Sequence, residues 1–170
     1  FIPAAGFNLA ATISRPAGAA GALPAVILVG GSNLTDRDET VGGIPVFGQI
    51  ASALADAGFV VVRYDRRGTG QSGGRPEAAT LSDFAEDVRS IVRFLRRRDD
   101  VDEDRLAIFG LGEGGWVGLL AADAVVVGEA DDIWPTVVAD AKRRELKPIY
   151  RPPLPTLAGH PFARRDIFKK

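Results

Sequence analysis

A glycine-rich corner is the part of this sequence whose residue types and spacing could do chemistry. The apolar run 106–109 leads into Gly110-Leu111-Gly112-Glu113-Gly114, and a helix-compatible stretch follows. In a strand-to-helix corner of the form G-x-S-x-G, the central serine sits on a sharp turn and attacks an acyl carbon. Gly112 stands at that serine position. We call this strand-to-helix corner the nucleophile elbow. The sequence therefore predicts an elbow formed by Gly110, Gly112 and Gly114 that lacks its nucleophile.

Three short strands and two helices must position this elbow. The continuous apolar runs 25–30, 59–64 and 105–109 predict strands that are buried on both faces of a sheet. Helical spacing of apolar residues predicts a first helix over 45–57, opened by Pro45 and stopped by Gly58. A second helix follows Thr80, which has capping-box spacing to Asp83, and closes at the basic run 96–98. The apolar positions of the two helices are Phe47, Ile50, Ala51 and Leu54, then Phe84, Val88, Ile91, Val92 and Leu95.

The alternation of strands and helices predicts the fold class. Strand-helix repeats of these lengths are typical of an α/β protein with a mostly parallel sheet and helices on both faces. Residues 1–2 and 7–15 add an edge hairpin closed by Pro16. In such a sheet the functional loops gather at the carboxyl ends of the strands. We expect these loops to be 30–33, 65–72 and 110–115.

The character of the sequence changes after Ala122. Residues 124–128 suit one more strand and 132–146 one more helix, whereas 148–170 hold five of the 11 prolines. This last stretch also carries five basic residues and one acidic residue, although the whole chain has a net charge of −1. We therefore predict a domain over 1–147 and a basic, proline-rich extended tail over 148–170.

Composition narrows the function classes. The near-neutral charge argues against a general nucleic-acid binder, and the absence of cysteine excludes disulfides and cysteine-based metal sites. No metal site and no cofactor are expected. No apolar run approaches the ~20 residues of a transmembrane helix, so we expect a soluble or peripheral protein. The chain starts at Phe1, and both a cytoplasmic location and export after loss of a leader stay open.

Three segments taken together resemble a known family. Residues 24–32 (PAVILVGGS), 63–72 (RYDRRGTGQS) and 110–116 (GLGEGGW) are similar to the α/β-hydrolase superfamily. The resemblance is to bacterial serine-hydrolase-like proteins of the dipeptidyl-peptidase and serine-aminopeptidase type. It covers residues 1–122, and it implies an α/β-hydrolase-like fold whose second half is truncated.

The resemblance also implies roles for individual residues. In that family the oxyanion is held by the N–H after the nucleophile and by another from the loop after the first central strand. These correspond to Glu113 N–H and to the N–H of Gly31 or Ser32. The Glu113 side chain is expected to be structural or to line the pocket.

The same resemblance assigns no certain base. The family order of nucleophile, acid and histidine is formally met by Gly112, Asp140 and the single histidine, His160. However, only 48 positions separate Gly112 from His160, which lies in the predicted tail. On the loop 65–72, Ser72 is expected to hold its own turn, and Asp65 to brace the loop.

Three functional hypotheses follow. The first is a non-catalytic α/β-hydrolase-like protein, a binding or structural subunit whose tail 148–170 helps a protein partner or a second copy cover the sheet edge. The alternative is a serine-type hydrolase of esters or peptides with incomplete or displaced catalytic residues. A third hypothesis, a phosphate-binding protein, has less support, because the glycine spacing fits neither a dinucleotide fingerprint nor a P-loop.

Overall fold

The computed structural model describes residues 1–32, 36–126, 133–143 and 145–151. The chain divides into two compact units, Phe1–Ala122 and Asp123–Lys170. The first unit ends where the family resemblance ends. In the part of the chain that is described, no helix is long and apolar enough to cross a membrane.

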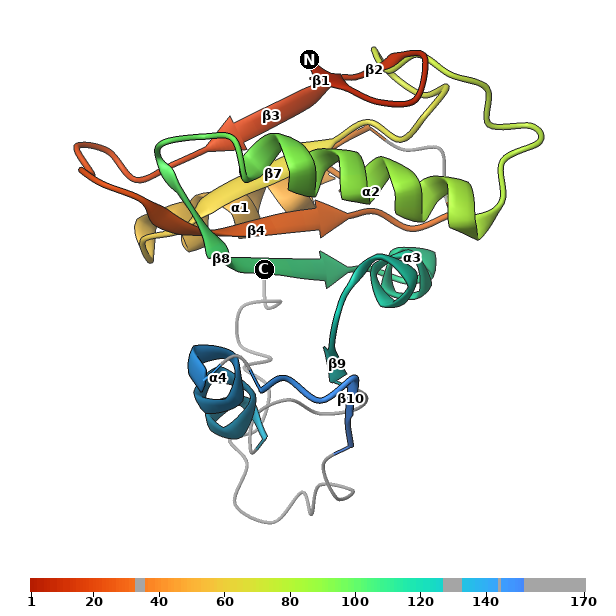
Figure 1. Cartoon of the computed structure of the whole chain (residues 1–170). Helices are drawn as coiled ribbons and strands as arrows, with labels where there is room; N and C mark the ends of the chain where they lie inside the picture. Colours follow the sequence, from red (N-terminus) through yellow and green to blue (C-terminus); the bar gives the residue numbers. More distant parts are fainter. Residues whose placement is uncertain (33–35, 127–132, 144, 152–170) are drawn as a thin grey trace, which may run out of the picture. The chain divides into compact units, whose positions relative to one another are not determined.

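The first unit is built on a four-stranded sheet in the order β3-β7-β4-β8 (Figure 1). Its strands are β3 (Ala11–Ser14), β4 (Leu23–Val29), β7 (Val60–Tyr64) and β8 (Val101–Gly110). β7, β4 and β8 run parallel, and β3 pairs antiparallel with β7 at one edge. The prediction of a mostly parallel sheet is confirmed. The prediction that 105–109 is buried on both faces is wrong, because β8 lies at the edge of the sheet and its Phe109 is 43% exposed.

The expected edge hairpin over residues 1–15 is wrong in part. β1 (Ile2–Pro3) and β2 (Asn8–Leu9) do form an antiparallel pair, but β3 leaves them and joins the main sheet. The physical reason lies at Ala10, which the loop after β7 holds. Ala10 N–H donates to Ser72 Oγ at 2.8 Å, and Ala10 O accepts from Asp65 N–H at 2.9 Å.

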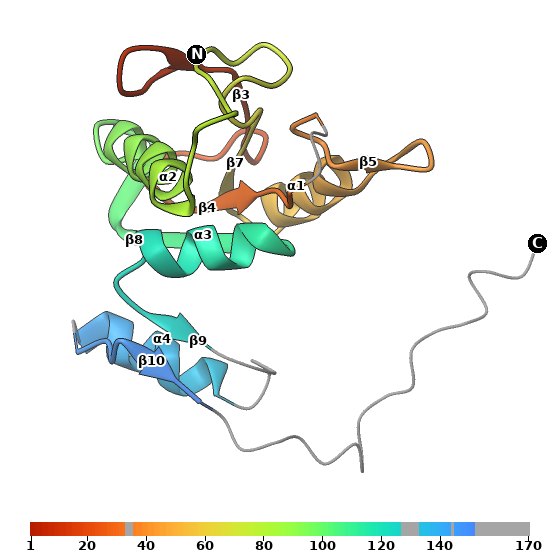
Figure 2. The ribbon, with the colours of Figure 1, turned by 90° about the vertical axis from the view of Figure 1, so that its right-hand side faces the viewer.

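Helices cover both faces of the sheet because side chains alternate along each strand. α1 (Val46–Asp56) packs Phe47 and Ala51 onto one face, against Leu28 and Val61. α2 (Leu81–Leu95) and α3 (Glu113–Ala121) share the other face, where Ile27 and Val62 are buried (Figure 2). Both helices predicted in the first unit are present, each within two residues of its expected start.

The capping box of α2 gives a direct prediction for stability. Thr80 Oγ1 accepts from Asp83 N–H, as the spacing predicted, and this satisfies a free donor at the start of the helix. Thr80→Ala should lower the free energy of unfolding by about 1 kcal/mol. Urea denaturation followed by circular dichroism would measure it. Ser82→Ala, which changes an exposed neighbour, should shift stability by less than ~0.5 kcal/mol; equal losses in the two variants would contradict the capping role.

The second unit contains a small strand-helix-strand arrangement. β9 (Val125–Val126) pairs in parallel with β10 (Ile149–Tyr150), and α4 (Trp134–Arg143) lies between them in sequence. Among the described residues, β9 lies within the expected strand 124–128 and α4 within the expected helix 132–146. β10 falls inside the predicted tail 148–170, so residues near the start of that tail pair with another strand. The rest of that tail, 152–170, lies outside the described residues, as do 33–35, 127–132 and 144.

The first unit also contains a short antiparallel pair of strands before α1. These strands are β5 (Thr40–Val41) and β6 (Ile44–Pro45).

Candidate functional site: an elbow without a nucleophile

The elbow forms as the sequence predicts. β8 ends at Gly110 and α3 begins at Glu113, and between them Gly112 has φ +56° and ψ −122°. Residues that carry a side chain rarely adopt this backbone conformation, so glycine avoids backbone strain at this position. The turn is also packed closely against the end of β4, because a Cβ on Gly114 would lie 2.2 Å from Val29 O.

Of the two alternatives for the second oxyanion donor, Gly31 N–H and Ser32 N–H, the first is already engaged. Gly31 N–H donates to Glu39 Oε1 at 3.1 Å, and Glu39 is buried with only 6% of its surface exposed. Glu39 also has a positive φ of 47°, which non-glycine residues rarely adopt. No local pattern indicated this contact, because Glu39 sits among three other charged residues on the loop. Glu113 N–H lies at the start of α3, where helix N–H groups lack helical partners.

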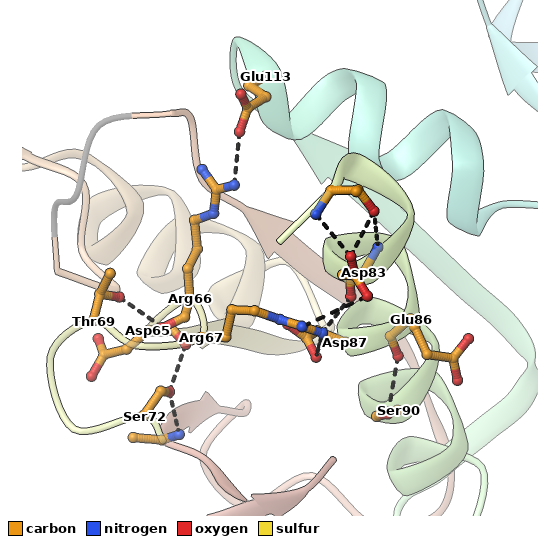
Figure 3. Close-up of polar contacts among 12 residues, drawn as sticks. Asp65, Arg66, Arg67, Thr69, Ser72, Asp83, Glu86, Asp87, Ser90 and Glu113 are labelled. Carbon is orange, nitrogen blue, oxygen red and sulfur yellow. Dashed lines mark hydrogen bonds and ion pairs between the residues drawn. The ribbon is translucent and has the colours of Figure 1, made fainter. Parts of the chain in front are cut away.

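Arg66 joins the three loops that were expected to gather. Its Nη1 donates to Gly31 O. Its Nη2 donates to Glu113 Oε1 at 2.7 Å, as Figure 3 shows. The guanidinium also lies over the Phe84 ring, 4.0 Å from its centroid. The loops after β4, β7 and β8 therefore meet at one cation, which no sequence motif had indicated.

A pocket of about 210 Å³ lies beside this cation. We call it the elbow pocket, and it is lined by Ser32, Arg66, Arg67, Pro76, Ala79, Phe84 and Glu113. Two of the predicted site residues, Ser32 and Glu113, therefore share one cavity. The expectation that the Glu113 side chain lines a pocket agrees with its position there.

The second arginine on the pocket wall, Arg67, forms an ion pair with Asp87. Its guanidinium donates to both Asp87 oxygens, at 2.7 and 2.8 Å, and to Asp83 O (Figure 3). Burial raises the pKa of Asp87 above its ordinary value, although the hydrogen bonds from Arg67 lower it. Because Asp87 is 2% exposed, the pair neutralises itself inside the protein.

Asp65 braces the loop after β7, as predicted. Its oxygens accept from Arg37 Nε at 3.1 Å, Arg37 Nη2 at 2.8 Å and Gln71 N–H at 2.9 Å. Ser72 Oγ donates to Asp65 O at 2.6 Å while it accepts from Ala10 N–H. Ser72 is thus occupied in its own turn, which agrees with the structural role expected for it.

The formal acid and base, Asp140 and His160, belong to the second unit. Asp140 accepts from Tyr150 OH at 2.7 Å and pairs with Arg143, all within the second unit. His160 lies outside the described residues. Within the described ranges, no group of three His, Cys, Asp or Glu side chains could hold a metal ion.

Comparison with known proteins identifies relatives of the first unit. Residues 44–132 match the family model of serine aminopeptidase, S33. The esterase EstD of Thermotoga maritima is 36% identical over 94 residues, which are 55% of this chain and 23% of the esterase. An uncharacterised protein of Pseudomonas aeruginosa is 31% identical over 123 residues, 72% of this chain and 31% of that protein. The chain thus spans less than a third of the length of these curated relatives.

Solved structures agree on the fold. The structure of a hypothetical protein from Pseudomonas aeruginosa has a TM-score of 0.59 and 29% identity, over 71% of this chain and 38% of that one. Est1E from Butyrivibrio proteoclasticus, solved with ferulic acid, has a TM-score of 0.63 and 23% identity, over 74% of this chain and 50% of that one. The second likeness concerns the fold alone. Because the family model covers more than half of the chain, this protein belongs to the serine aminopeptidase S33 family and has an α/β-hydrolase fold.

Proposed function

We propose that this chain is a non-catalytic member of the family that binds a ligand or a partner without forming a covalent intermediate. The observation that carries the proposal is Gly112, which occupies the tip of a well-formed elbow and offers no attacking atom. The engagement of Gly31 N–H by Glu39 supports it, because an oxyanion bound by this N–H would have to compete with a buried carboxylate.

An ester assay tests this proposal. The chain should hydrolyse 4-nitrophenyl acetate no faster than buffer, and Ser32→Ala should leave that background unchanged. Turnover above background that persists in Ser32→Ala and disappears in His160→Ala would contradict the proposal. It would instead favour the second candidate, a hydrolase with displaced catalytic residues, for which the esterase named among the relatives is the supporting observation.

Replacing Gly112 by serine separates the two candidates further. A Cβ at this position would meet its nearest neighbour, Gly31 Cα, at 4.0 Å, so the side chain fits. The positive φ should cost about 1–2 kcal/mol of unfolding free energy. We expect Gly112→Ser to fold, to melt several degrees lower and to gain no esterase activity over Gly112→Ala, which carries the same strain without a hydroxyl. A tenfold gain by the serine variant alone would show that a functional base reaches the elbow.

We also propose a protein partner or a second copy at the edge of the sheet. β8 is the last strand of the sheet in the first unit, and among the described residues no strand pairs with its outer edge. Unpaired edges favour association with another chain. The assignment of the tail 148–170 to this contact stays part of the proposal. Light scattering on a size-exclusion column should give at least a dimer mass, and a well-folded monomer would refute this part.

A further inference from the structure

We propose that the elbow pocket binds a small carboxylate, which replaces Glu113 as the anionic partner of Arg66. The inference rests on the proposed function, because an elbow without a nucleophile can hold such a group without reacting with it. Its starting point is the ion pair between Arg66 Nη2 and Glu113 Oε1, which lies on the pocket wall (Figure 3).

Arg66 is a cation whose position does not depend on Glu113 alone. Its side chain is 10% exposed, its Nη1 donates to Gly31 O, and its guanidinium stacks over the Phe84 ring at 4.0 Å. These two contacts hold the guanidinium in place if the carboxylate moves away. A partly buried guanidinium that loses its anion is unfavourable, so the vacated position attracts another anion.

Glu113 is suited to leave. Its side chain is 32% exposed, so water can solvate the carboxylate once it swings out of the pocket. As the first residue of α3 it also stays close to the positive end of the helix dipole, which favours the displaced charge. A ligand carboxylate could therefore take over the hydrogen bond to Arg66 at a small cost in Glu113 contacts.

Charge and size define the ligand class. Of the two arginines on the wall, Arg67 is neutralised by its bidentate pair with Asp87, which leaves one cation for the ligand. A single charge suits a carboxylate better than a dianionic phosphate, whose second charge would lack a partner. The cavity of about 210 Å³ lies below the roughly 300–1,000 Å³ of pockets for drug-sized ligands. Its apolar wall of Pro76, Ala79 and Phe84 suits a short hydrophobic body.

Calorimetric titration with benzoate tests the proposal. Benzamide, which has the same shape and no charge, serves as the matched ligand, and inorganic phosphate tests the charge argument. Wild-type protein should bind benzoate more tightly than benzamide or phosphate. Glu113→Gln should strengthen benzoate binding about fivefold or more, because the ligand then competes with a neutral amide. Arg66→Gln should abolish binding, whereas Arg97→Gln, on a different cavity wall, should leave it unchanged.

The decisive variant is Glu113→Gln, since it predicts a gain and does not depend on the folding of Arg66→Gln. Benzoate binding that is no tighter in Glu113→Gln than in wild type would overturn the proposal. Equal affinity for benzamide, or tighter binding of phosphate, would overturn it as well. Failure of the proposed function looks different, because it would appear as turnover of 4-nitrophenyl acetate by the unaltered chain whether or not benzoate binds.

Discussion

Gly114→Ala should destabilise the first unit by about 3 kcal/mol or more, the upper end of the cost of overpacking. An added Cβ would lie 2.2 Å from Val29 O and 2.5 Å from Gly30 O. Both are backbone atoms at the end of a buried strand, so no side-chain rotation can relieve the clash. Urea unfolding followed by circular dichroism measures the loss.

The neighbouring glycine provides a matched control. A Cβ on Gly115 would meet Gly110 O at 3.8 Å, which is an ordinary contact. Since alanine is favoured over glycine inside a helix, Gly115→Ala should raise stability by up to about 1 kcal/mol. If the two variants unfold at the same urea concentration, the result would contradict the close packing of Gly114 in α3 against the end of β4.

Asp65→Ala should lower the free energy of unfolding by about 3–5 kcal/mol, because it leaves Arg37 as a partly buried cation without its anion. Asp65 is 3% exposed and the Arg37 side chain 18%. A double-mutant cycle with Arg37→Ala tests the cause. The double variant should lose less than the sum of the single variants, and strict additivity would show that the two side chains do not interact.

The charge of Asp65 also predicts the pH dependence. Burial raises its pKa, but hydrogen bonds from Arg37 and Gln71 N–H outweigh burial and hold the pKa below its ordinary value. The contribution to stability is therefore fully present above the unfolded pKa of about 3.9 and is lost as the pH falls through the folded pKa. Wild-type protein should lose more stability between pH 6 and pH 3 than Asp65→Asn does. Parallel curves for the two proteins would contradict this assignment.

Local patterns determined much of the first unit. Apolar runs predicted the buried strands β4 and β7, helical spacing predicted the faces of α1 and α2, and Thr80 with Asp83 predicted the start of α2. These succeed because strand alternation, helix periodicity and capping depend on residues close together in the chain. The sharp turn of the elbow was also predictable from its glycines, since a positive φ and a close backbone approach both exclude side chains. The same kind of apolar run did not show that β8 is an edge strand, because its neighbours in the sheet are set by the fold.

Contacts between distant residues decided the rest. The separation of β3 from the terminal hairpin depends on hydrogen bonds between Ala10 and the loop after β7, 55 to 62 positions away in sequence. Glu39 under Gly31, and Arg66 between Gly31 and Glu113, likewise join loops that only the folded sheet brings together.

The sequence alone therefore determined that the elbow forms and lacks its serine, because both properties depend only on the five consecutive residues 110–114. Only the tertiary structure decided that Gly31 N–H, one of the candidate oxyanion donors, is occupied and that the partly buried Arg66 lines the pocket beside the elbow. The reason is physical. A glycine's backbone freedom is a local property, whereas the partner of an N–H or a guanidinium is set by how parallel strands place their loops at one edge of the sheet.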